Sequence, residues 1–209
     1  MNIEKIDHFV YVVPSLEEGV AKIEKLLGVM PSPGGSHPDK GTHNALVGLG
    51  SRTYFEIIAP DPSQKHTGDR WMGVDRPENY FRITRWAFQL DTLEEKLSEL
   101  SEYFEKPVSL FNGRRISPEG GILEWKMTEP LSRHEIEIVP FLIAWNGNDH
   151  PCQSIKHPCR LTRLRLFHPH PQKINHVLAL LEVPFQVQYG KIPRISVQID
   201  SPNGTVLIS

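Results

Sequence analysis

Two copies of one short sequence pattern, 77 positions apart, constrain the fold more than any other feature of this chain. Residues 9–18 read FVYVVPSLEE and residues 86–95 read WAFQLDTLEE. In each copy, a strand-like run leads into Ser or Thr followed three residues later by Glu, the pattern of a capped helix start. His8 precedes the first copy, and Arg85 is its counterpart before the second. A duplicated strand–helix unit with a histidine on one copy predicts a small-molecule pocket between related halves.

Hydrophobic periodicity extends each copy into a βαβββ unit. Apolar residues continue at helical spacing after each cap, and Gly28 and Pro107 mark the two helix ends. A third strand–helix pattern begins near Leu161, with Pro171 suited to the first turn of its helix. The predicted helices are 16–27, 93–104 and 171–181, and the predicted strands are 6–12, 43–49, 53–59, 84–90, 108–112, 122–128, 135–143, 161–167, 185–189, 193–200 and 205–208.

The expected architecture is α+β, with repeated βαβββ modules forming curved antiparallel and mixed sheets around a pocket and helices on the outside. The long polar connection between the first two modules carries apolar anchors, so we expect it to pack and to cover a pocket. The predicted parts are paired modules at 1–145 (module one 1–60, long loop 61–82, module two 83–145), a linker at 146–160 and a third, smaller module at 161–209.

Composition excludes several classes of function. The chain has 209 residues, 39% hydrophobic and 23% charged, which is ordinary for a globular protein. A net charge of −2 gives no basic footprint for nucleic acid. No apolar run approaches the roughly 18–20 residues that span a bilayer, and residues 1–5 do not begin a signal peptide. Two cysteines make no disulfide framework. We therefore expect a cytoplasmic protein with neither nucleic-acid nor membrane partners.

Five short motifs follow one another along the two modules, and together they resemble a known family. They are DH at 7–8, GGSH at 34–37, GTHN at 41–44, YFEI at 54–57 and PFLIAW at 140–145. The ordered set is similar to the glyoxalase-like group of the vicinal oxygen chelate superfamily. The resemblance implies the fold more firmly than an activity, since one fold hosts unrelated chemistries.

The resemblance places His8 and Glu56 side by side on the concave face of the first module. An imidazole and a carboxylate are ligands for Zn, Ni, Mn or Fe, and the same carboxylate can move a proton of the substrate. The alternative is a core histidine hydrogen-bonded to a carboxylate. His43 and His37 are further candidate ligands. If His43 shares a face with Ala45, it reaches the pocket. Otherwise it caps the strand from outside.

The second module lacks an obvious ligand pair. Arg85 stands at the His8 position, and either Glu137 or Leu142 falls near the Glu56 position. A metal site divided between modules is therefore not supported. Either the first module supplies three ligands, or the pocket is metal-free. The candidate substrate-binding residues are Arg114, which the resemblance places at the pocket rim, Arg85, Asn44 and Trp125. The alternatives are a solvated pair of Arg114 and Arg115, a surface salt bridge at Arg85 and a core position for Trp125.

Two functions follow from these residues. The first is a small-molecule enzyme, with a divalent metal at His8 and Glu56 and a lyase, isomerase or dioxygenase reaction. The second is a metal-free protein that binds or sequesters small molecules, as in bleomycin-resistance relatives. The expected partner is a small, anionic molecule, and a homodimer is compatible with either function. His150-Pro151-Cys152 recurs at 157–159, but its spacing matches no known zinc finger.

Overall fold

The first two modules close into one eight-stranded barrel. The structure is a computed structural model that describes residues 3–116, 121–130, 135–145 and 150–209. Module one contains β1 (Ile6–Val12), α1 (Leu16–Leu27), β2 (Ser32–His37), β3 (Thr42–Gly50) and β4 (Thr53–Pro60). Module two contains β5 (Arg82–Gln89), α2 (Leu97–Phe104), β6 (Leu110–Ile116), β7 (Ile122–Thr128) and β8 (Phe141–Trp145). The strand order is β1-β4-β3-β2-β6-β7-β8-β5. The predicted α+β class, with a curved mixed sheet, is confirmed.

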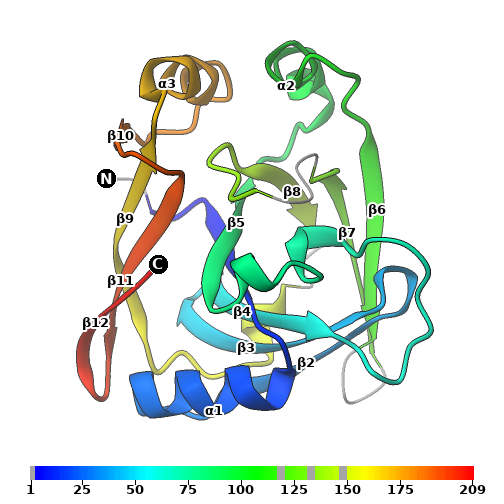
Figure 1. Ribbon diagram of the computed structural model, residues 1–209, viewed down its shortest axis with the longest axis vertical. Helices are drawn as coiled ribbons and strands as arrows, with labels where there is room; N and C mark the ends of the chain where they lie inside the picture. Colours follow the sequence, from blue (N-terminus) through cyan, green and yellow to red (C-terminus); the bar gives the residue numbers. More distant parts are fainter. Residues whose placement is uncertain (1–2, 117–120, 131–134, 146–149) are drawn as a thin grey trace.

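The duplicated pattern forms the central seam of this barrel. β1 and β5 pair antiparallel, with Phe9 opposite Trp86. In both modules the first strand pairs parallel with the last, β1 with β4 and β5 with β8. Figure 1 shows α1 and α2 at opposite ends of the molecule, outside the sheet. The two copies are therefore structural counterparts, and residues 77 positions apart can be compared directly.

The two predicted capping boxes have different outcomes. Ser15 caps α1 as expected, because its hydroxyl accepts from the Glu18 amide at 3.2 Å and donates to the Glu18 carboxylate at 3.1 Å. The box predicted at Thr92 and Glu95 is wrong. Glu94–Lys96 forms a 3₁₀ turn without a side-chain cap, and α2 starts only at Leu97.

The third segment repeats the order of elements with a different sheet. It contains β9 (Arg160–His168), α3 (Pro171–Leu180), β10 (Val187–Tyr189), β11 (Arg194–Ser201) and β12 (Gly204–Ile208). The strand order is β10-β9-β11-β12, so its first strand lies inside the sheet next to its third. In the barrel modules, the first strand instead pairs with the fourth. The same order of strands and helix along the chain thus produces two different sheet topologies.

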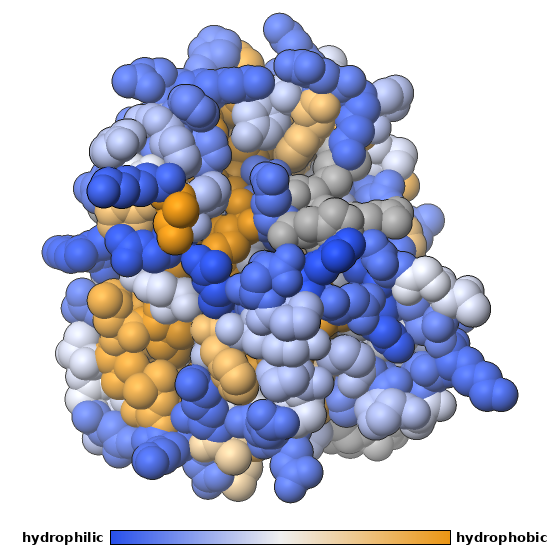
Figure 2. Space-filling model, viewed as in Figure 1, coloured by the Kyte–Doolittle hydropathy of each residue, from blue (hydrophilic) through white to orange (hydrophobic). Residues whose placement is uncertain are grey.

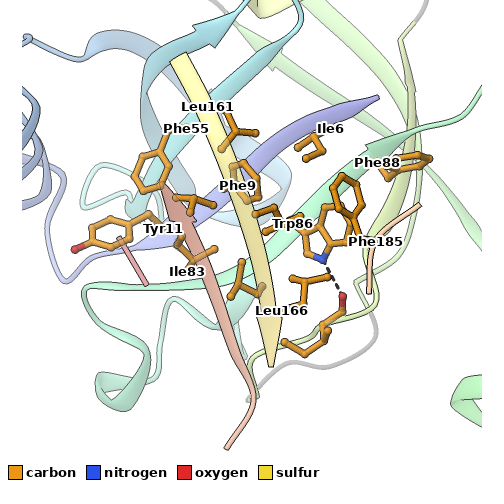
Figure 3. Packing of buried hydrophobic residues seen from close by; sticks show 14 of the residues in the cluster. Ile6, Phe9, Tyr11, Phe55, Ile83, Trp86, Phe88, Leu161, Leu166 and Phe185 are labelled. Atoms are coloured by element: carbon orange, nitrogen blue, oxygen red, sulfur yellow. Dashed lines mark hydrogen bonds between the residues drawn. The ribbon is translucent and has the colours of Figure 1, made fainter. Parts of the chain in front are cut away.

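The third sheet packs on the outside of the barrel and shares its core. Leu161 and Leu166 of β9 face Phe9 and Trp86 of the barrel (Figure 3). Phe185, just before β10, lies edge-on to Trp86, with ring centroids 5.7 Å apart. Figure 2 shows a mostly polar surface on one side of the molecule, with apolar residues gathered over β11 and β12. The third sheet and the outer face of the barrel therefore share one apolar cluster.

The long loop after β4 is anchored rather than open. The carboxylate of Asp75 accepts from the Arg70 backbone amide at 2.6 Å and from its guanidinium at 2.7 Å. Thr84 donates from its hydroxyl to the carbonyl of Met72 at 2.9 Å. Met72 lies in the left-handed region at φ 57° and is buried. This backbone strain is tolerated because contacts on both sides fix the loop. None of the helices in the described ranges is long and apolar enough to cross a membrane.

Trp86 is a direct test of the shared core. Its side chain is fully buried, and its indole N–H donates to the carbonyl of Ile138 at 2.8 Å. Trp86→Phe removes that donor and leaves a cavity between the barrel and the third sheet. We expect a loss of about 1.5–3 kcal/mol in the free energy of unfolding, measured by urea denaturation. Tyr189→Phe, at a residue 70% exposed, is the control and should change stability little. Equal stability of both variants would contradict the shared core.

Candidate functional site

The barrel encloses one narrow cavity that collects most of the predicted site residues. Its empty volume is about 360 Å³ when the space at its opening to solvent is included. Strands of both modules and the long loop contribute to its wall. The lining residues are His8, His37, Asn44, Tyr54, Glu56, Trp71, Met72, Arg115, Trp125, Met127, Phe141, Ile143 and Trp145. Of the predicted residues, His8, Glu56, His37, Asn44 and Trp125 meet here.

A β-bulge at the start of β1 turns two consecutive side chains toward the site. Ile6 pairs with Phe88 and His8 pairs with Ala87, so Asp7 is an extra residue in the strand. Strict alternation predicts Ile6 and His8 on one face and Asp7 on the other, and this is wrong. Ile6 packs in the outer core, whereas the Asp7 carboxylate lies 2.6 Å from Nδ1 of His8. The bulge therefore builds an Asp–His pair from neighbouring residues.

Asp7 is a fully buried carboxylate with donors from several segments. Besides His8, its Oδ2 atom accepts from Gln89 of β5 at 2.7 Å and from the indole of Trp145 at 2.8 Å. His150 is a further donor at 3.2 Å. Burial alone would raise the pKa of Asp7, but the hydrogen bonds from His150 and His8 outweigh it and hold that pKa well below its usual value. Asp7 is therefore an ionised acceptor at neutral pH.

The imidazole of His8 has a fixed orientation. Because ionised Asp7 only accepts, Nδ1 of His8 carries a proton, and Nε2 points toward Oε2 of Glu56 at 3.8 Å. The ring stacks on Tyr54, with centroids 4.6 Å apart and planes 14° apart. Phe141 lies edge-on to it at 5.3 Å. Glu56 is fixed from its other oxygen, which accepts from the amide of Asn44 at 2.5 Å.

Arg115 brings a positive charge to the same cavity. It lies on β6, is 4% exposed, and its Nη1 atom donates to Oδ1 of Asn44 at 3.5 Å. Gly34 leaves the necessary space, since a Cβ there would lie 2.1 Å from Asn44 Oδ1 and 2.8 Å from Arg115 Nη1. The residue predicted from the family resemblance is the neighbouring Arg114. Arg114 is exposed and pairs with Asp39 at 3.3 Å, outside the cavity.

Aromatic rings form much of the remaining wall. Trp71, Trp125 and Trp145 all line the cavity. His37 lies edge-on to Trp71 and Trp125, and its Nδ1 atom is 3.2 Å from the Thr42 hydroxyl. Burial and the charge of Arg115 lower the pKa of His37 to about 3, so its imidazole is neutral at physiological pH.

Besides Arg114, two more predicted residues lie elsewhere. His43 does share a face with Ala45, but this is the outer face of β3, where His43 lines a surface groove with Asp61. Arg85 lies in a separate cavity of about 290 Å³ beside α2. Its guanidinium donates to the carbonyl of Thr84 at 2.7 Å and to that of Glu135. Burial lowers the pKa of Arg85 to about 10. The structure does not bring either residue to His8.

The register identifies what replaced Glu56 in module two. Val10 pairs with Glu56 across β1 and β4, and its counterpart Ala87 pairs with Phe141 across β5 and β8. Phe141 therefore stands at the Glu56 position, rather than Glu137 or Leu142. Within the described ranges, no group of three His, Cys, Asp or Glu side chains is placed to hold a metal ion.

Sequence reasoning missed three residues that complete the site. Asp7 was hidden by the bulge and Arg115 by the uncertain parity of β6. His150 was placed in a linker, where its local sequence gives no sign of a contact 143 residues away. The motif PFLIAW did contain a usable signal, because its last residue, Trp145, donates to Asp7.

Comparisons with known proteins agree with this geometry. The sequence model of the family described as "Glyoxalase-like domain" matches residues 6–181. This chain belongs to the glyoxalase-like domain family. The family match supports a small-molecule enzyme or binding protein of the vicinal oxygen chelate superfamily. No curated protein matches the chain.

Solved structures are similar to this glyoxalase-like protein at low sequence identity. A hypothetical protein from Staphylococcus aureus is 14% identical, with a TM-score of 0.64, covering 90% of this chain and 87% of that chain. A methylmalonyl-CoA epimerase from Mycobacterium tuberculosis is 16% identical, with a TM-score of 0.43, covering 68% and 86%. A hypothetical protein from Bacillus halodurans C-125 is 16% identical, with a TM-score of 0.44, covering 70% and 96%. The first of these supports the fold across nearly the whole chain.

Asp7→Asn tests the buried carboxylate. At pH 7 we expect it to lower the free energy of unfolding by about 2–4 kcal/mol. The NH₂ group of the introduced amide would face the N–H donors that bind the Asp7 carboxylate, and these donors would lose their acceptor. The depressed pKa of Asp7 adds stability that is present above the unfolded value of about 3.9 and is lost as pH falls below it. The difference in the free energy of unfolding between wild type and variant should therefore become smaller from pH 5 to pH 3. Urea denaturation at several pH values measures this difference. Asp39→Asn, at an exposed carboxylate, controls for the change in net charge. A gap that stays constant with pH would contradict an ionised Asp7.

Proposed function

We propose that this protein is an enzyme that moves a proton within a small anionic substrate bound in the barrel cavity. The observation that carries the proposal is the His8 imidazole, held between Asp7 and Glu56 beside Arg115. Asp7 fixes the ring through Nδ1, which leaves Nε2 for the substrate. Imidazole and carboxylate are the side chains most used to transfer protons near neutral pH.

The spacing of the two groups favours a short proton shift. His8 Nε2 and Glu56 Oε2 are 3.8 Å apart, so both reach neighbouring atoms of one substrate. In the proposed step, Glu56 accepts a proton from a carbon next to a carbonyl and passes it to the lone pair on Nε2 of His8, while the Nδ1 proton of His8 stays bound to Asp7. His8 then returns the proton to the neighbouring carbon of the substrate, which leaves the enzyme unchanged. These proton transfers together make an isomerase reaction. The same pair of side chains can also catalyse an elimination.

Arg115 and the aromatic wall define the proposed substrate. A guanidinium in a buried, narrow cavity favours a carboxylate or a similar anion. Asn44 connects Arg115 to Glu56, so the bound anion lies close to the carbon that loses its proton. Trp125 and Trp145 favour an apolar or planar remainder.

The donor set does not fit the divalent metal that the family resemblance implies. A catalytic zinc site usually takes three protein ligands, and here His8 and Glu56 are two. Their counterparts Arg85 and Phe141 are not metal ligands, and His43 lies outside the cavity. His37 lines the cavity, but among the described residues it does not form a group of three ligands with His8 and Glu56. The proposed step therefore rests on the side chains themselves.

Metal-free binding without reaction is the second candidate function. The observation that favours it is the cavity wall, which is dominated by tryptophan, phenylalanine and methionine side chains. Such a wall binds planar molecules without chemistry.

Arg115→Met tests the anion site. In a panel of small 2-oxo and 2-hydroxy carboxylates, we expect at least one to raise the Tm of the wild type. The variant should lose affinity by roughly 30-fold or more, because a charged hydrogen-bonding partner is removed. Arg114→Met is the matched control, since it removes the same charge one residue away and outside the cavity. Equal loss in both variants would show a general charge effect and contradict a site at Arg115.

Glu56→Gln and His8→Gln test the proton transfer. The assay is deuterium uptake at the carbon next to the carbonyl of a bound ligand, followed by NMR in D₂O. We expect wild type to catalyse the exchange and each variant to slow it by about 10²–10⁴-fold. Both variants should still bind the ligand, because Arg115 remains.

Two outcomes would count against the proposed metal-free reaction. Binding without exchange would support the sequestering protein instead. In the second outcome, exchange disappears after treatment with a chelator and returns with added Zn²⁺, Ni²⁺, Mn²⁺ or Fe²⁺. This result would show that the reaction depends on a metal ion.

A further inference from the structure

His150 lies beneath the proposed centre although it belongs to neither barrel module. It precedes the 3₁₀ turn η5 (Pro151–Gln153) in the segment that leads to the third sheet. Its side chain is 3% exposed. The ring lies edge-on to Trp145 and Tyr54, with centroids 5.3 and 5.8 Å away. A histidine enclosed in this way has a specific partner or a specific task.

The hydrogen bonds of His150 determine its tautomer. The backbone amide of Cys152 is 3.1 Å from Nδ1, and an amide N–H only donates, so Nδ1 carries a lone pair. In the neutral ring the proton is then on Nε2, which lies 3.2 Å from Oδ2 of Asp7. His150 is therefore a neutral ring with one donor, aimed at Asp7. Pro151 at the first position of η5 fixes the turn that supplies the Cys152 amide.

This donor acts on the side of Asp7 that faces away from His8. Oδ2 is bound by His150, Trp145 and Gln89, and Oδ1 remains for Nδ1 of His8. Donors on Oδ2 fix the plane of the carboxylate, so Oδ1 has one direction in which to accept. That direction keeps the proton of His8 on Nδ1 and its Nε2 toward Glu56.

We propose that His150 is a positioning residue for the His8 centre, and that the segment that begins at His150 is thereby part of the site. The proposal rests on the proposed function for its catalytic meaning, while its structural content is independent of any substrate. The segment is held against the barrel further along as well. A Cβ at Gly48 of β3 would lie only 2.4 Å from the carbonyl oxygen of Lys156, so glycine permits this close approach.

The test measures the tautomer of His8 by ¹⁵N NMR of histidine-labelled protein at one fixed pH. The exchange rate of the Nδ1 proton of His8 is measured on the same samples. His150→Phe keeps a ring and removes the donor. His150→Asn keeps a polar group too short to reach Asp7, and it serves if the Phe variant does not fold. His150→Gln places an amide N–H near the original Nε2. His157→Phe is the matched control, since it changes the exposed histidine of the other His-Pro-Cys copy.

We expect wild-type His8 to be a single Nδ1–H tautomer with a slowly exchanging proton. His150→Phe and His150→Asn should give mixed tautomers and exchange faster on the order of tenfold, as expected for loss of a hydrogen bond to a charged group. His150→Gln and His157→Phe should match wild type. An unchanged tautomer and exchange rate in both the Phe and Asn variants would overturn the proposal.

The result separates this proposal from the proposed function. If His8 keeps its tautomer in all variants while deuterium uptake still requires Glu56, the enzyme stands and the role of His150 falls. If wild type catalyses no uptake but His150→Phe disturbs His8, the positioning role stands and the enzyme falls.

Discussion

The buried charge of Asp7 is the interaction on which the site depends. An isolated carboxylate inside a protein is expensive, and the structure compensates it with donors from His8, Gln89, Trp145 and His150. These residues come from β1, β5, β8 and the segment beyond the barrel. Each segment must be in place for the charge to remain satisfied. The same atom pairs therefore stabilise the closed barrel and orient the imidazole that faces the cavity.

Duplication explains why the centre is one-sided. The barrel offers two equivalent positions for a histidine and two for a carboxylate. Module one has His8 and Glu56, and module two has Arg85 and Phe141. Arg85 binds backbone carbonyls beside α2, while Phe141 packs against His8. The second copy thus supports the fold and shapes the wall, and the chemistry is left to the first.

Much of the fold was predictable from sequence, and much of the site was not. The repeat and its periodicity predicted the paired βαβββ modules, and the family resemblance placed His8 and Glu56 side by side. Strand parity failed where the backbone is irregular, as at the bulge of Asp7. It also could not choose between Arg114 and Arg115, because β6 has polar residues on both faces. His150 depends on a contact between distant segments, which no local pattern encodes. Thr92 is an example of a local motif that fails in the folded chain. The sequence carries a capping-box pattern there, but the helical turn that follows has no side-chain cap.

The contact between Asp7 and His150 also orders events during folding. It joins residues 143 positions apart, and the Trp145 contact joins residues 138 apart, whereas the β3–β4 hairpin forms between neighbours. Local pairs close quickly, and distant ones wait until the intervening chain is arranged. Both modules must therefore be synthesised and paired before His8 acquires its final orientation. Acquisition of the ordered centre is a late event, and an ordered His8 reports that the barrel and the segment behind it have assembled together.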